Sequence, residues 1–420
     1  MKHIGQGKLG PTHPLISVER ARMAAIAGVL PITGSEQLPL ADVLGRVLDG
    51  DVNSSIALPP FDQSAMDGYA VRSAEFVAIP TARKVTSRIA AGQRPAKDGY
   101  PDLSVVRILT GAEVPPGFDA VIMQEFCDRA GDIVSINHQP VCGENIRRAG
   151  EDVQAGATLV ASGTTVDARH IAIMAAGGIR KVDVRRKVKV GLISTGSELC
   201  GTSEELQPGR IYDSNKPMLA ALLTRPGIDL HDCGHVTDDP DLLAQAFFNA
   251  SESIGVLVST GGISVGEEDH VQAAIASKGG YVDALRAGIK PGKPVAIGRL
   301  GNCVLLALPG NPLSALVTFL WFARPVIEKR MGMTPSVPTA IRAQAGFHEE
   351  RRPGRDEFVP VAMKVGSDGR LTVSKLGRGG SSRLSPLVTA NGLARIPGNL
   401  ERIQPGEYLD VYPFSGALLA

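Results

Sequence analysis

Apolar runs and segments of helical spacing alternate in the central part of the chain, between residues 187 and 332. In the segment 240–250, for example, Leu243, Phe247 and Ala250 fall on one face of a helix. Continuous apolar runs are typical of parallel strands that are buried on both faces, so this alternation predicts a doubly wound, mostly parallel α/β domain. The runs are KVGLIST (189–195), IGVLVST (254–260) and CVLLALP (303–309).

The pattern changes on either side of this region. Helical spacing between residues 18 and 48 ends in the loop-like string DVNSSIALPPFD, and it returns between residues 151 and 180. Short β-type runs such as VRILT and DAVIMQE, separated by Gly and Pro turns, fill the interval from 83 to 150. After Gly332 the helices stop, and FVPVAMKV, LTVSKL and YLDVYPF predict a small β-barrel or sandwich.

We therefore expect an α/β multidomain protein with four domains, in which a β-rich domain is inserted into a helical one. The expected boundaries are 1–56 plus 149–186 for the helical and extended domain, 57–148 for the inserted β-rich domain, 187–332 for the α/β domain and 333–420 for the C-terminal β domain.

Composition narrows the possible function classes. The 420 residues include 44 Lys and Arg against 43 Asp and Glu, which gives a formal net charge of +1. That balance excludes both a disordered acidic protein and a strongly basic nucleic-acid coat. The 48 glycines and 29 prolines exceed average usage. We expect part of this surplus at turns where the backbone approaches a ligand closely.

Cysteine usage and hydropathy bear on the cellular location. Five cysteines form no Cys-x-x-Cys pair and leave an odd one, which suits a reducing compartment better than a disulfide framework. The first residues contain no apolar signal-peptide core. The charge-free stretch 300–323 is long enough to cross a bilayer, but Pro-Gly-Asn-Pro at its centre favours a buried strand, a tight loop and a buried helix. We expect a cytoplasmic protein without a membrane or nucleic-acid partner.

Three of the predicted strands end in loops that are rich in Gly or Pro and lead into helices. The carboxyl ends of parallel strands meet at one edge of the sheet, where α/β proteins bind their ligands. Free backbone N–H groups at a helix start attract an anion. The candidate binding residues are Ser194, Thr195 and Gly196 in the first loop, Gly261, Gly262 and Ser264 in the second, and Pro309, Gly310, Asn311 (the expected N-cap of a helix) and Pro312 in the third.

Charged residues near the same loops indicate the kind of ligand. Lys290 and Lys293 lie in the stiff segment Lys-Pro-Gly-Lys-Pro and favour a phosphate or another oxyanion. Asp238 and Asp269, each at the start of a predicted helix, are candidate ligands of Mg²⁺ together with phosphate oxygens. The alternative that Asp238 only caps its helix is about equally open. A further polar segment, 59–70, is neither helical nor alternating and is expected to be a loop with two carboxylates.

Two weaker signals are not favoured. The string Gly5-Gln6-Gly7-Lys8-Leu9-Gly10 fits the dinucleotide pattern Gly-x-Gly-x-x-Gly, but it follows no strand and opens no helix. His231, Cys233 and His235 alternate along a predicted strand and so share one face. No further ligand cluster occurs at metal-binding spacing, so a zinc site is not expected there.

Together these segments resemble the molybdopterin molybdenumtransferase family, which is known as MoeA in bacteria and as the E domain of gephyrin in animals. The resemblance covers nearly the whole chain, and several long motifs in the same order make it specific. The motifs are PPFDQSAMDGYAV, TGAEVPPGFDAVIMQE, NIRRAGEDVQAGATL, STGSEL, GRIYDSNKPML, STGGISVGEEDH, KPGKP and LPGNPLSAL.

The resemblance implies a homodimer, assembled through the helical and extended domain, with its active site between the α/β domain of one subunit and the β-rich domain of the other. The reaction that it implies is insertion of molybdate into adenylylated molybdopterin, with Mg²⁺-dependent cleavage that releases AMP and yields molybdenum cofactor. The two dithiolene sulfurs of the substrate would then bind molybdenum, so the protein needs no cysteine of its own for the metal.

The family's functional residues can be carried over motif by motif. One position departs from the pattern: some relatives have a lysine four residues before the first Lys of KPGKP, where this chain has Arg286, so an identical role for Arg286 is not expected. The resemblance implies catalytic roles for Asp67, Thr110, Asp152, Glu198, Asp238 and Asp269, an oxyanion site framed by Lys290, Lys293, Pro309 and Pro312, and molybdate contacts from Arg355, Ser382 and Arg383.

Two other functions are alternatives to this one. A molybdopterin adenylyltransferase shares the α/β domain, but it is a single domain, whereas this chain has additional domains on both sides. A scaffold of the gephyrin kind is a minor alternative, because this chain lacks a fused adenylyltransferase domain and a long linker. The adenylyltransferase and apo molybdoenzymes are the partners that the resemblance implies.

Overall fold

The computed structural model describes residues 15–261, 270–292, 295–377 and 380–414. The chain divides into two compact units. Unit 1 consists of Met1–Glu36, Gly45–Val47 and Arg185–Ala420, and unit 2 of Gln37–Leu44 and Leu48–Val184.

The centre of unit 1 is a six-stranded sheet in the order β16-β13-β17-β21-β20-β18. Its first four strands are parallel, as the apolar runs predicted, and the last two join in antiparallel pairings. In the middle of the sheet Leu192 pairs with Val258, and Val258 pairs with Leu306. The strands are β13 (Val188–Thr195), β16 (Ile228–Val236), β17 (Val256–Thr260), β18 (Tyr281–Leu285), β20 (Val295–Leu300) and β21 (Cys303–Leu308).

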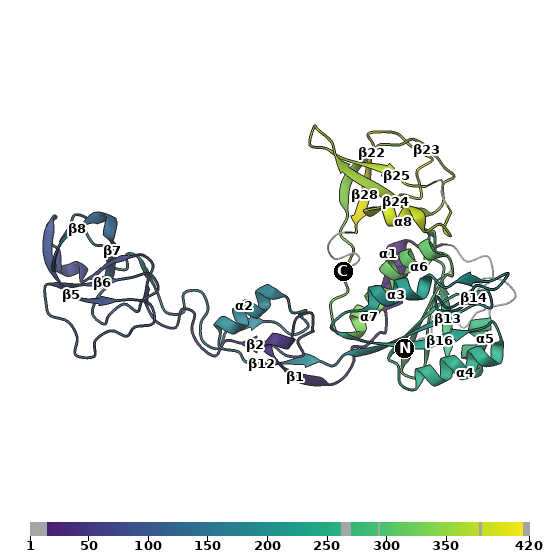
Figure 1. Cartoon of the computed structure of the whole chain (residues 1–420), viewed down its shortest axis with the longest axis horizontal. Coiled ribbons are helices and arrows are strands. Elements are labelled where there is room, and N and C mark those ends of the chain that lie inside the picture. The colour runs from purple at the N-terminus through teal and green to yellow at the C-terminus, as the bar shows by residue number, and fades with distance from the viewer. Residues whose placement is uncertain (1–14, 262–269, 293–294, 378–379, 415–420) are drawn as a thin grey trace. The chain divides into compact units, whose positions relative to one another are not determined.

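Helices cover both faces of this sheet (Figure 1). Consecutive residues of one strand belong to different cores: Leu192 packs in the core with Leu219 of α3, and Ile193 packs in the core with Phe247 of α4. Burial on both sides explains why the strands read as continuous apolar runs. One face carries α1 (Val18–Ile26), α3 (Asn215–Leu223), α6 (Pro312–Thr318) and α7 (Arg324–Arg330), and the other α4 (Pro240–Ser251) and α5 (His270–Ser277).

The charge-free stretch 300–323 is largely buried in this unit, apart from two turns at 301–302 and 309–312. It forms strand β21, a short loop, α6 and a π-helical turn at Phe319–Ala323 that runs into α7. Its side chains between Leu313 and Ala323 are buried in the protein core. Among the residues that the structure describes, no helix is both long and apolar enough to cross a membrane.

The C-terminal sheet of unit 1 is closed into a barrel, because β24 pairs with both β25 and β26. The expectation that helices stop after Gly332 was wrong in one place: α8 (Ser385–Thr389) is a five-residue helix that starts with Ser-Pro. Proline at such a position favours one helical turn. The strands are β19 (Ile289–Lys290), β22 (Ile341–Ala345), β24 (Asp356–Val365), β25 (Leu371–Lys375), β26 (Gly392–Ile396) and β28 (Tyr408–Pro413), with a separate pair β23 (Glu349–Glu350) and β27 (Arg402–Ile403).

The N-terminal helix α1 is attached to parts of unit 1 that lie far along the sequence. Ile16 donates its backbone N–H to the carbonyl of Arg286, and Gly288 donates to the carbonyl of Ile16. Glu19 in the first turn of α1 forms an ion pair with Arg395 of β26 at 2.7 Å. The start of the described chain is therefore fixed to both the α/β part and the barrel.

Unit 2 contains a six-stranded sheet in the order β7-β4-β6-β5-β9-β8. The segment 59–70 was expected to be a loop, and this was wrong at two places: Gln63–Ser64 forms a short strand, β3, and β4 begins at Gly68 and lies between β6 and β7. All four residues of β4 are buried, so the strand shows no alternation of polar and apolar residues. The strands are β4 (Gly68–Val71), β5 (Thr81–Ile89), β6 (Ser104–Ile108), β7 (Ala120–Met123), β8 (Cys127–Ala130) and β9 (Ile133–Ile136).

The remainder of unit 2 is built around the helix α2 (Ala168–Ala176). Asp167 caps this helix, and its side chain accepts from the backbone N–H groups of Arg169 and His170. Met174 packs in a core with Leu48 and Val184. Three two-stranded ladders complete the unit: β1 (Ser35–Pro39) with β12 (Lys181–Arg185), β2 (Val52–Asn53) with β11 (Thr158–Val160), and β3 (Gln63–Ser64) with β10 (Ile146–Arg147).

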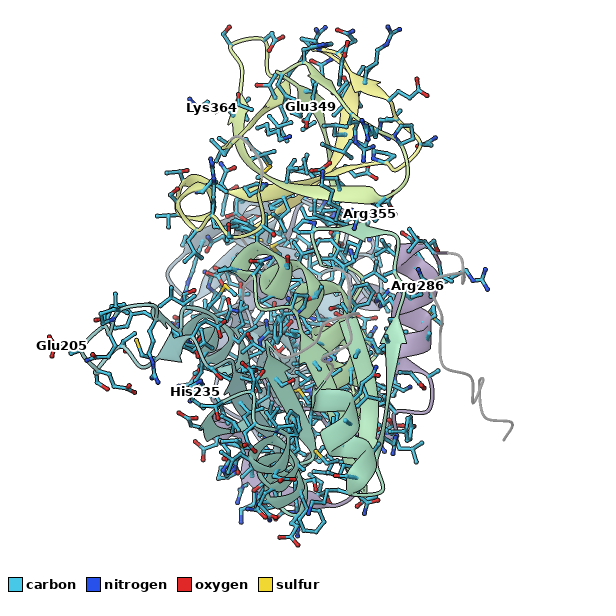
Figure 2. All side chains as sticks on the ribbon, turned by 90° about the vertical axis from the view of Figure 1, so that its right-hand side faces the viewer. Glu205, His235, Arg286, Glu349, Arg355 and Lys364 are labelled. Carbon is cyan, nitrogen blue, oxygen red and sulfur yellow. The ribbon has the colours of Figure 1, made fainter. Side chains whose placement is uncertain are left out.

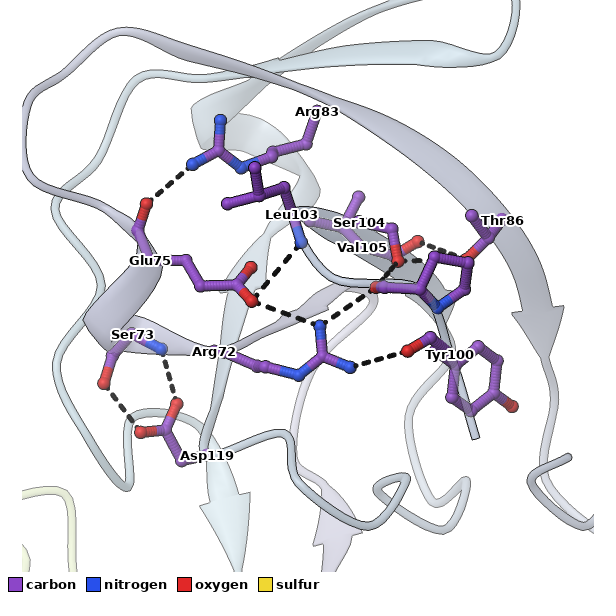
Figure 3. Close-up of polar contacts among 11 residues, drawn as sticks. Arg72, Ser73, Glu75, Arg83, Thr86, Tyr100, Leu103, Ser104, Val105 and Asp119 are labelled. Carbon is purple, nitrogen blue, oxygen red and sulfur yellow. Dashed lines mark hydrogen bonds and ion pairs between the residues drawn. The ribbon is translucent and has the colours of Figure 1, made fainter. Parts of the chain in front are cut away.

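A polar network fixes the loops at one side of the six-stranded sheet of unit 2 (Figure 3). The guanidinium of Arg72 donates to the carbonyls of Tyr100 and Pro101, and it pairs with Glu75. Asp119 accepts from both the backbone N–H and the hydroxyl of Ser73, at 2.6 and 2.7 Å. These contacts connect segments that are 28 to 46 residues apart in sequence.

Candidate functional site

The first two loops of the predicted crevice meet at the ends of β13 and β17. Ser194 and Thr195 are buried. The hydroxyl of Ser194 donates to the carboxylate of Asp213, and the hydroxyl of Thr195 donates to the carbonyl of Thr260 at 3.4 Å. Ser194 and Thr195 were expected in the first loop, but they are the last two residues of β13, and these contacts fix the end of that strand against β17 and the residues just before α3.

Glu198 and Asp238 both lie around the loop that follows β13. The backbone N–H of Ser197 donates to Asp238 Oδ2 at 2.9 Å, and the N–H of Asp238 donates to Ser197 Oγ at 3.1 Å. The cap of α4 is Asp239, which accepts from the N–H groups of the first turn, so capping does not account for Asp238. Gly196 has a φ of +142°, a backbone conformation that favours glycine, and it lies beside the carboxylate of Glu198.

The second and third loops approach each other through glycines. Gly261 has a φ of +89° and donates its N–H to the carbonyl of Leu308, and a Cβ there would lie 2.2 Å from the carbonyl oxygen of Thr195. Asn215 donates to Thr260 Oγ1 at 2.9 Å and to the carbonyl of Gly310 at 2.6 Å. The structure thus brings all three loops together, as the sheet topology predicted. Gly262, Ser264, Asp269 and Lys293 lie outside the described residues, as does the segment Gly5–Gly10.

The third loop leads directly into α6. Pro312 is the first residue of this helix, as expected. Asn311 has the extended backbone of an N-cap and accepts from the N–H of Ala315 with its carbonyl, but its side chain makes no capping bond. The side chain of Asn311 lines a cavity, and so does Pro309.

That cavity, which we call the oxyanion cavity, has a volume of about 350 Å³ and lies between the loops of the α/β part and the barrel. Figure 2 shows Arg355 at the base of the barrel, where the barrel meets the α/β part. Lys290, Arg355 and Arg383 bring three cationic side chains to its lining, and Lys375 adds a fourth that contacts Glu349. Ser382 is not among the lining residues, but its neighbour Ser381 is. Further lining residues are Pro291, Gly292, Pro309, Asn311, Ser314, Glu357 and Pro386.

A larger cavity of about 610 Å³, which we call the mixed cavity, lies beside the loop that follows β13. Sequence reasoning did not find it, although the motif DSNKPML marks its position at the start of α3. Its polar groups include the ion pair between Lys216 and Asp232 and the carboxylate of Asp213. Its apolar lining is formed by Leu192, Leu199, Pro217, Ala220 and Leu230.

Three predicted site residues lie in unit 2. Thr110 donates to Asp67 with both its backbone N–H and its hydroxyl. These two bonds hold the pKa of the Asp67 carboxyl below its ordinary value, the backbone bond more than the hydroxyl. Asp152 donates its N–H to the carbonyl of Leu58. In this conformation, therefore, Asp67 and Thr110 form one polar pair.

Comparison with known proteins identifies the family. Three family profiles match in order: "MoeA N-terminal region (domain I and II)" at residues 16–178, "Probable molybdopterin binding domain" at 191–329 and "MoeA C-terminal region (domain IV)" at 342–414. A protein of Haemophilus influenzae named "Molybdopterin molybdenumtransferase" is 34% identical over 406 residues, which cover 96% of this chain and 100% of that protein. The chain belongs to the molybdopterin molybdenumtransferase family.

Further relatives support this family membership. A "Molybdopterin molybdenumtransferase" of Nostoc sp. is 34% identical over 404 residues, which cover 92% of both chains. The crystal structure of a molybdopterin biosynthesis MoeA protein from Pyrococcus horikoshii is similar with a TM-score of 0.80 at 29% identity, and the match covers 95% of this chain and 100% of that one. As a molybdopterin molybdenumtransferase family member, the chain is an enzyme of the transferase class.

Among the described residues, no group of three or more His, Cys, Asp or Glu side chains is placed so that it could hold a metal ion. The ring of His231 pairs with Asp229 at 3.1 Å, and the ring of His235 contacts the carbonyl of Gly196 at 2.7 Å. Burial raises the pKa of the Cys233 thiol, which disfavours the thiolate that zinc requires.

Proposed function

We propose that this protein is a molybdopterin molybdenumtransferase that inserts molybdate into adenylylated molybdopterin, with Mg²⁺-dependent release of AMP. The observation that carries the proposal is the oxyanion cavity, where Lys290, Arg355 and Arg383 line one space beside the third loop. We assign Pro309 and Pro312, on either side of Gly310 and Asn311, to the frame of this cavity. In the same proposal the enzyme acts in the cytoplasm.

The chemistry of the oxyanion cavity suits molybdate as the substrate that supplies the metal. Molybdate is a tetrahedral dianion with four acceptor oxygens and no proton to donate. Ammonium and guanidinium groups donate charge-assisted hydrogen bonds to such oxygens. The mixed cavity suits the organic substrate, because a pterin is flat and has donors and acceptors on its edge.

Carboxylates around the first loop suit Mg²⁺ and the phosphate link of the adenylylated substrate. Mg²⁺ prefers carboxylate and phosphate oxygens, and Glu198 and Asp238 present carboxylates around residues 196–198. When bound, the ion would polarise the phosphate that is cleaved. The loops of Ser194 and Gly261 would position that phosphate with their backbone groups. Asp269 belongs to the same set in this proposal.

Asp67, Thr110 and Asp152 complete the proposed catalytic residues. The proposal includes the homodimer that the family resemblance implies. Molybdopterin adenylyltransferase, which makes the substrate, and apo molybdoenzymes, which receive the product, are the proposed partners.

The decisive experiment mixes purified protein, adenylylated molybdopterin, Mg²⁺ and molybdate. It assays AMP release and the reconstitution of an apo molybdoenzyme. We expect both products with the native protein, and neither with Asp67→Ala or Lys290→Ala, while circular dichroism and gel filtration remain native. If the folded native protein formed neither AMP nor active cofactor, the assignment would fail.

A complementation experiment tests the homodimer. Asp67→Ala and Lys290→Ala chains are each expected to be inactive alone. Refolding an equal mixture of the two should restore about a quarter of native activity, because about half of the dimers are mixed and each mixed dimer has one intact site and one doubly substituted site. A mixture that stays inactive, although mass spectrometry shows mixed dimers, would contradict this part of the proposal.

A further inference from the structure

Lys290 of the oxyanion cavity is attached to the barrel through its backbone. The two-residue strand β19 pairs in parallel with β24, and Lys290 lies in register with Glu357. Asp356 donates its backbone N–H to the carbonyl of Gly288 at 2.9 Å. The position of the lysine backbone therefore depends on the first residues of β24.

The side chains of the same two residues form an ion pair. Lys290 Nζ lies 3.0 Å from Glu357 Oε1, and both residues line the oxyanion cavity. The lysine side chain is 51% exposed, whereas that of Glu357 is only 11% exposed. The exposed side chain of Lys290 is thus held by the carboxylate of Glu357, which is buried and belongs to the barrel strand β24.

Arg351 supports Glu357 from the other side. Arg351 Nε lies 3.8 Å from Glu357 Oε2, and this arginine side chain is 7% exposed. Its other guanidinium nitrogens donate to the carbonyls of Pro397, Leu400 and Arg355 at 2.6 to 3.1 Å. Arg351 therefore balances the charge of Glu357, and it also fixes the backbone of a second cavity residue, Arg355.

We propose that Glu357 is a positioning residue that holds the ammonium group of Lys290 at the oxyanion cavity and thereby sets the affinity for molybdate. The proposal rests on the proposed function of the cavity. A long lysine side chain loses rotamer entropy when it is immobilised. Glu357 immobilises it before molybdate arrives, and an ammonium group with three donors keeps two of them for the anion.

The test compares Glu357→Ala and Glu357→Gln with the native chain in the insertion assay. For Glu357→Ala we expect the KM for molybdate to rise about tenfold while kcat stays within about twofold, because the lost contact is made before and during the reaction alike. Glu357→Gln should restore much of the affinity, since the amide oxygen still accepts from Lys290. The matched control is Asp368→Asn, which removes one exposed carboxylate from the same barrel and should leave KM unchanged.

Direct binding of molybdate, measured by calorimetry without the organic substrate, provides a second readout. We expect the Kd to increase in the order native, Glu357→Gln, Glu357→Ala. An unchanged Kd for Glu357→Ala would overturn the proposal, and so would tighter binding, which would make Glu357 a competitor of the anion. If thermal melting shows that Glu357→Ala is unfolded, the Glu357→Gln variant provides the test instead. A Kd of Glu357→Gln for molybdate that is equal to or lower than the native Kd would then overturn the proposal.

The two proposals fail in different ways. If the native protein inserts molybdate and the Glu357 variants behave like it, only the positioning role is overturned. If the Kd order holds but the native protein releases no AMP, the transferase assignment fails and the positioning of Lys290 stands.

Discussion

Thr110 donates two hydrogen bonds to a single carboxylate oxygen of Asp67, one from its backbone N–H at 2.7 Å and one from its hydroxyl at 2.8 Å. Asp67 lies just before β4 and Thr110 just after β6, and because these two strands pair antiparallel, both residues lie at the same end of the strand pair. Both are exposed, so the pair is formed at the surface of unit 2. This pairing lowers the pKa of the Asp67 carboxyl and orients it.

Removing the Thr110 hydroxyl should raise the pKa of Asp67. In Thr110→Val the pKa should move toward its ordinary value but stay below it, because the backbone N–H, the larger cause of the shift, remains. Carbon-detected NMR titration of the Asp67 carboxyl measures this change. The control is Thr86→Val, whose hydroxyl contacts Ser104 and Val105 instead. An unchanged pKa in Thr110→Val would show that the hydroxyl contact does not persist in solution.

Gly68→Ala should disrupt the centre of the unit 2 sheet. A Cβ atom on Gly68 would lie 1.9 Å from the carbonyl oxygen of Ile122, so β4 would have to separate from β7. We expect a loss of about 3 kcal/mol or more in the free energy of unfolding, measured by urea denaturation. Gly50→Ala is the control, because nothing lies within 4 Å of a Cβ there, and its effect should stay within about 0.5 kcal/mol. Equal stabilities of the two variants would contradict the close strand contact.

Acid should loosen the loop that Asp119 holds. Burial would raise the pKa of the Asp119 carboxyl, but the hydrogen bonds from Ser73 outweigh burial and hold it below its ordinary value. A carboxyl whose pKa is lower in the folded than in the unfolded protein stabilises the fold fully at pH values above its pKa in the unfolded chain, which is about 3.9 for Asp. This stabilisation is lost as the pH falls from there through the pKa of the folded protein.

Hydrogen exchange of the segment 72–76 checks this prediction. In the native protein we expect exchange to accelerate below about pH 4, after correction for the intrinsic rate. In Asp119→Asn exchange should already be faster at pH 7, by about tenfold, and should vary less with pH. A pH profile that is the same in both proteins would show that other groups cause the acid response.

Chelation of zinc should change neither activity nor stability. The described residues provide no group of ligands for it, and the His231 and His235 rings already contact other groups. Dialysis against a zinc-selective chelator, followed by thermal melting and the insertion assay, tests this expectation with excess Mg²⁺ present. If chelation caused a large loss of activity or stability, and added zinc reversed it, this result would support a zinc site at His231, Cys233 and His235.

The α/β part could be predicted from the sequence because its strands are buried on both faces. Alternate residues such as Leu192 and Ile193 enter different cores, so each strand is a continuous apolar run. The loops after these strands had to converge once the sheet was parallel. Strand β4, which begins at Gly68, was not predicted because a short strand that is entirely buried has no alternating pattern. Glycine is needed at position 68 because the carbonyl of Ile122 leaves no room for a Cβ atom, and this contact cannot be read from the local sequence.

Contacts across long sequence separations could not be predicted in this way. The pairing of Lys290 with Glu357 depends on the register of two strands from different parts of the chain. Neither residue shows in its local sequence that it has this partner. Asn215 is similar, since its side chain joins Thr260 to Gly310 only after three strands have assembled.

The attachment of α1 has a consequence for synthesis on the ribosome. Ile16 and Glu19 emerge early, but their partners Arg286 and Arg395 emerge much later. Unit 2, which ends at Val184, is complete before most of unit 1 has been translated. Since domains fold as units while the chain grows, the inserted unit should be native first, with α1 waiting in an unfolded or chaperone-bound state until the barrel leaves the exit tunnel.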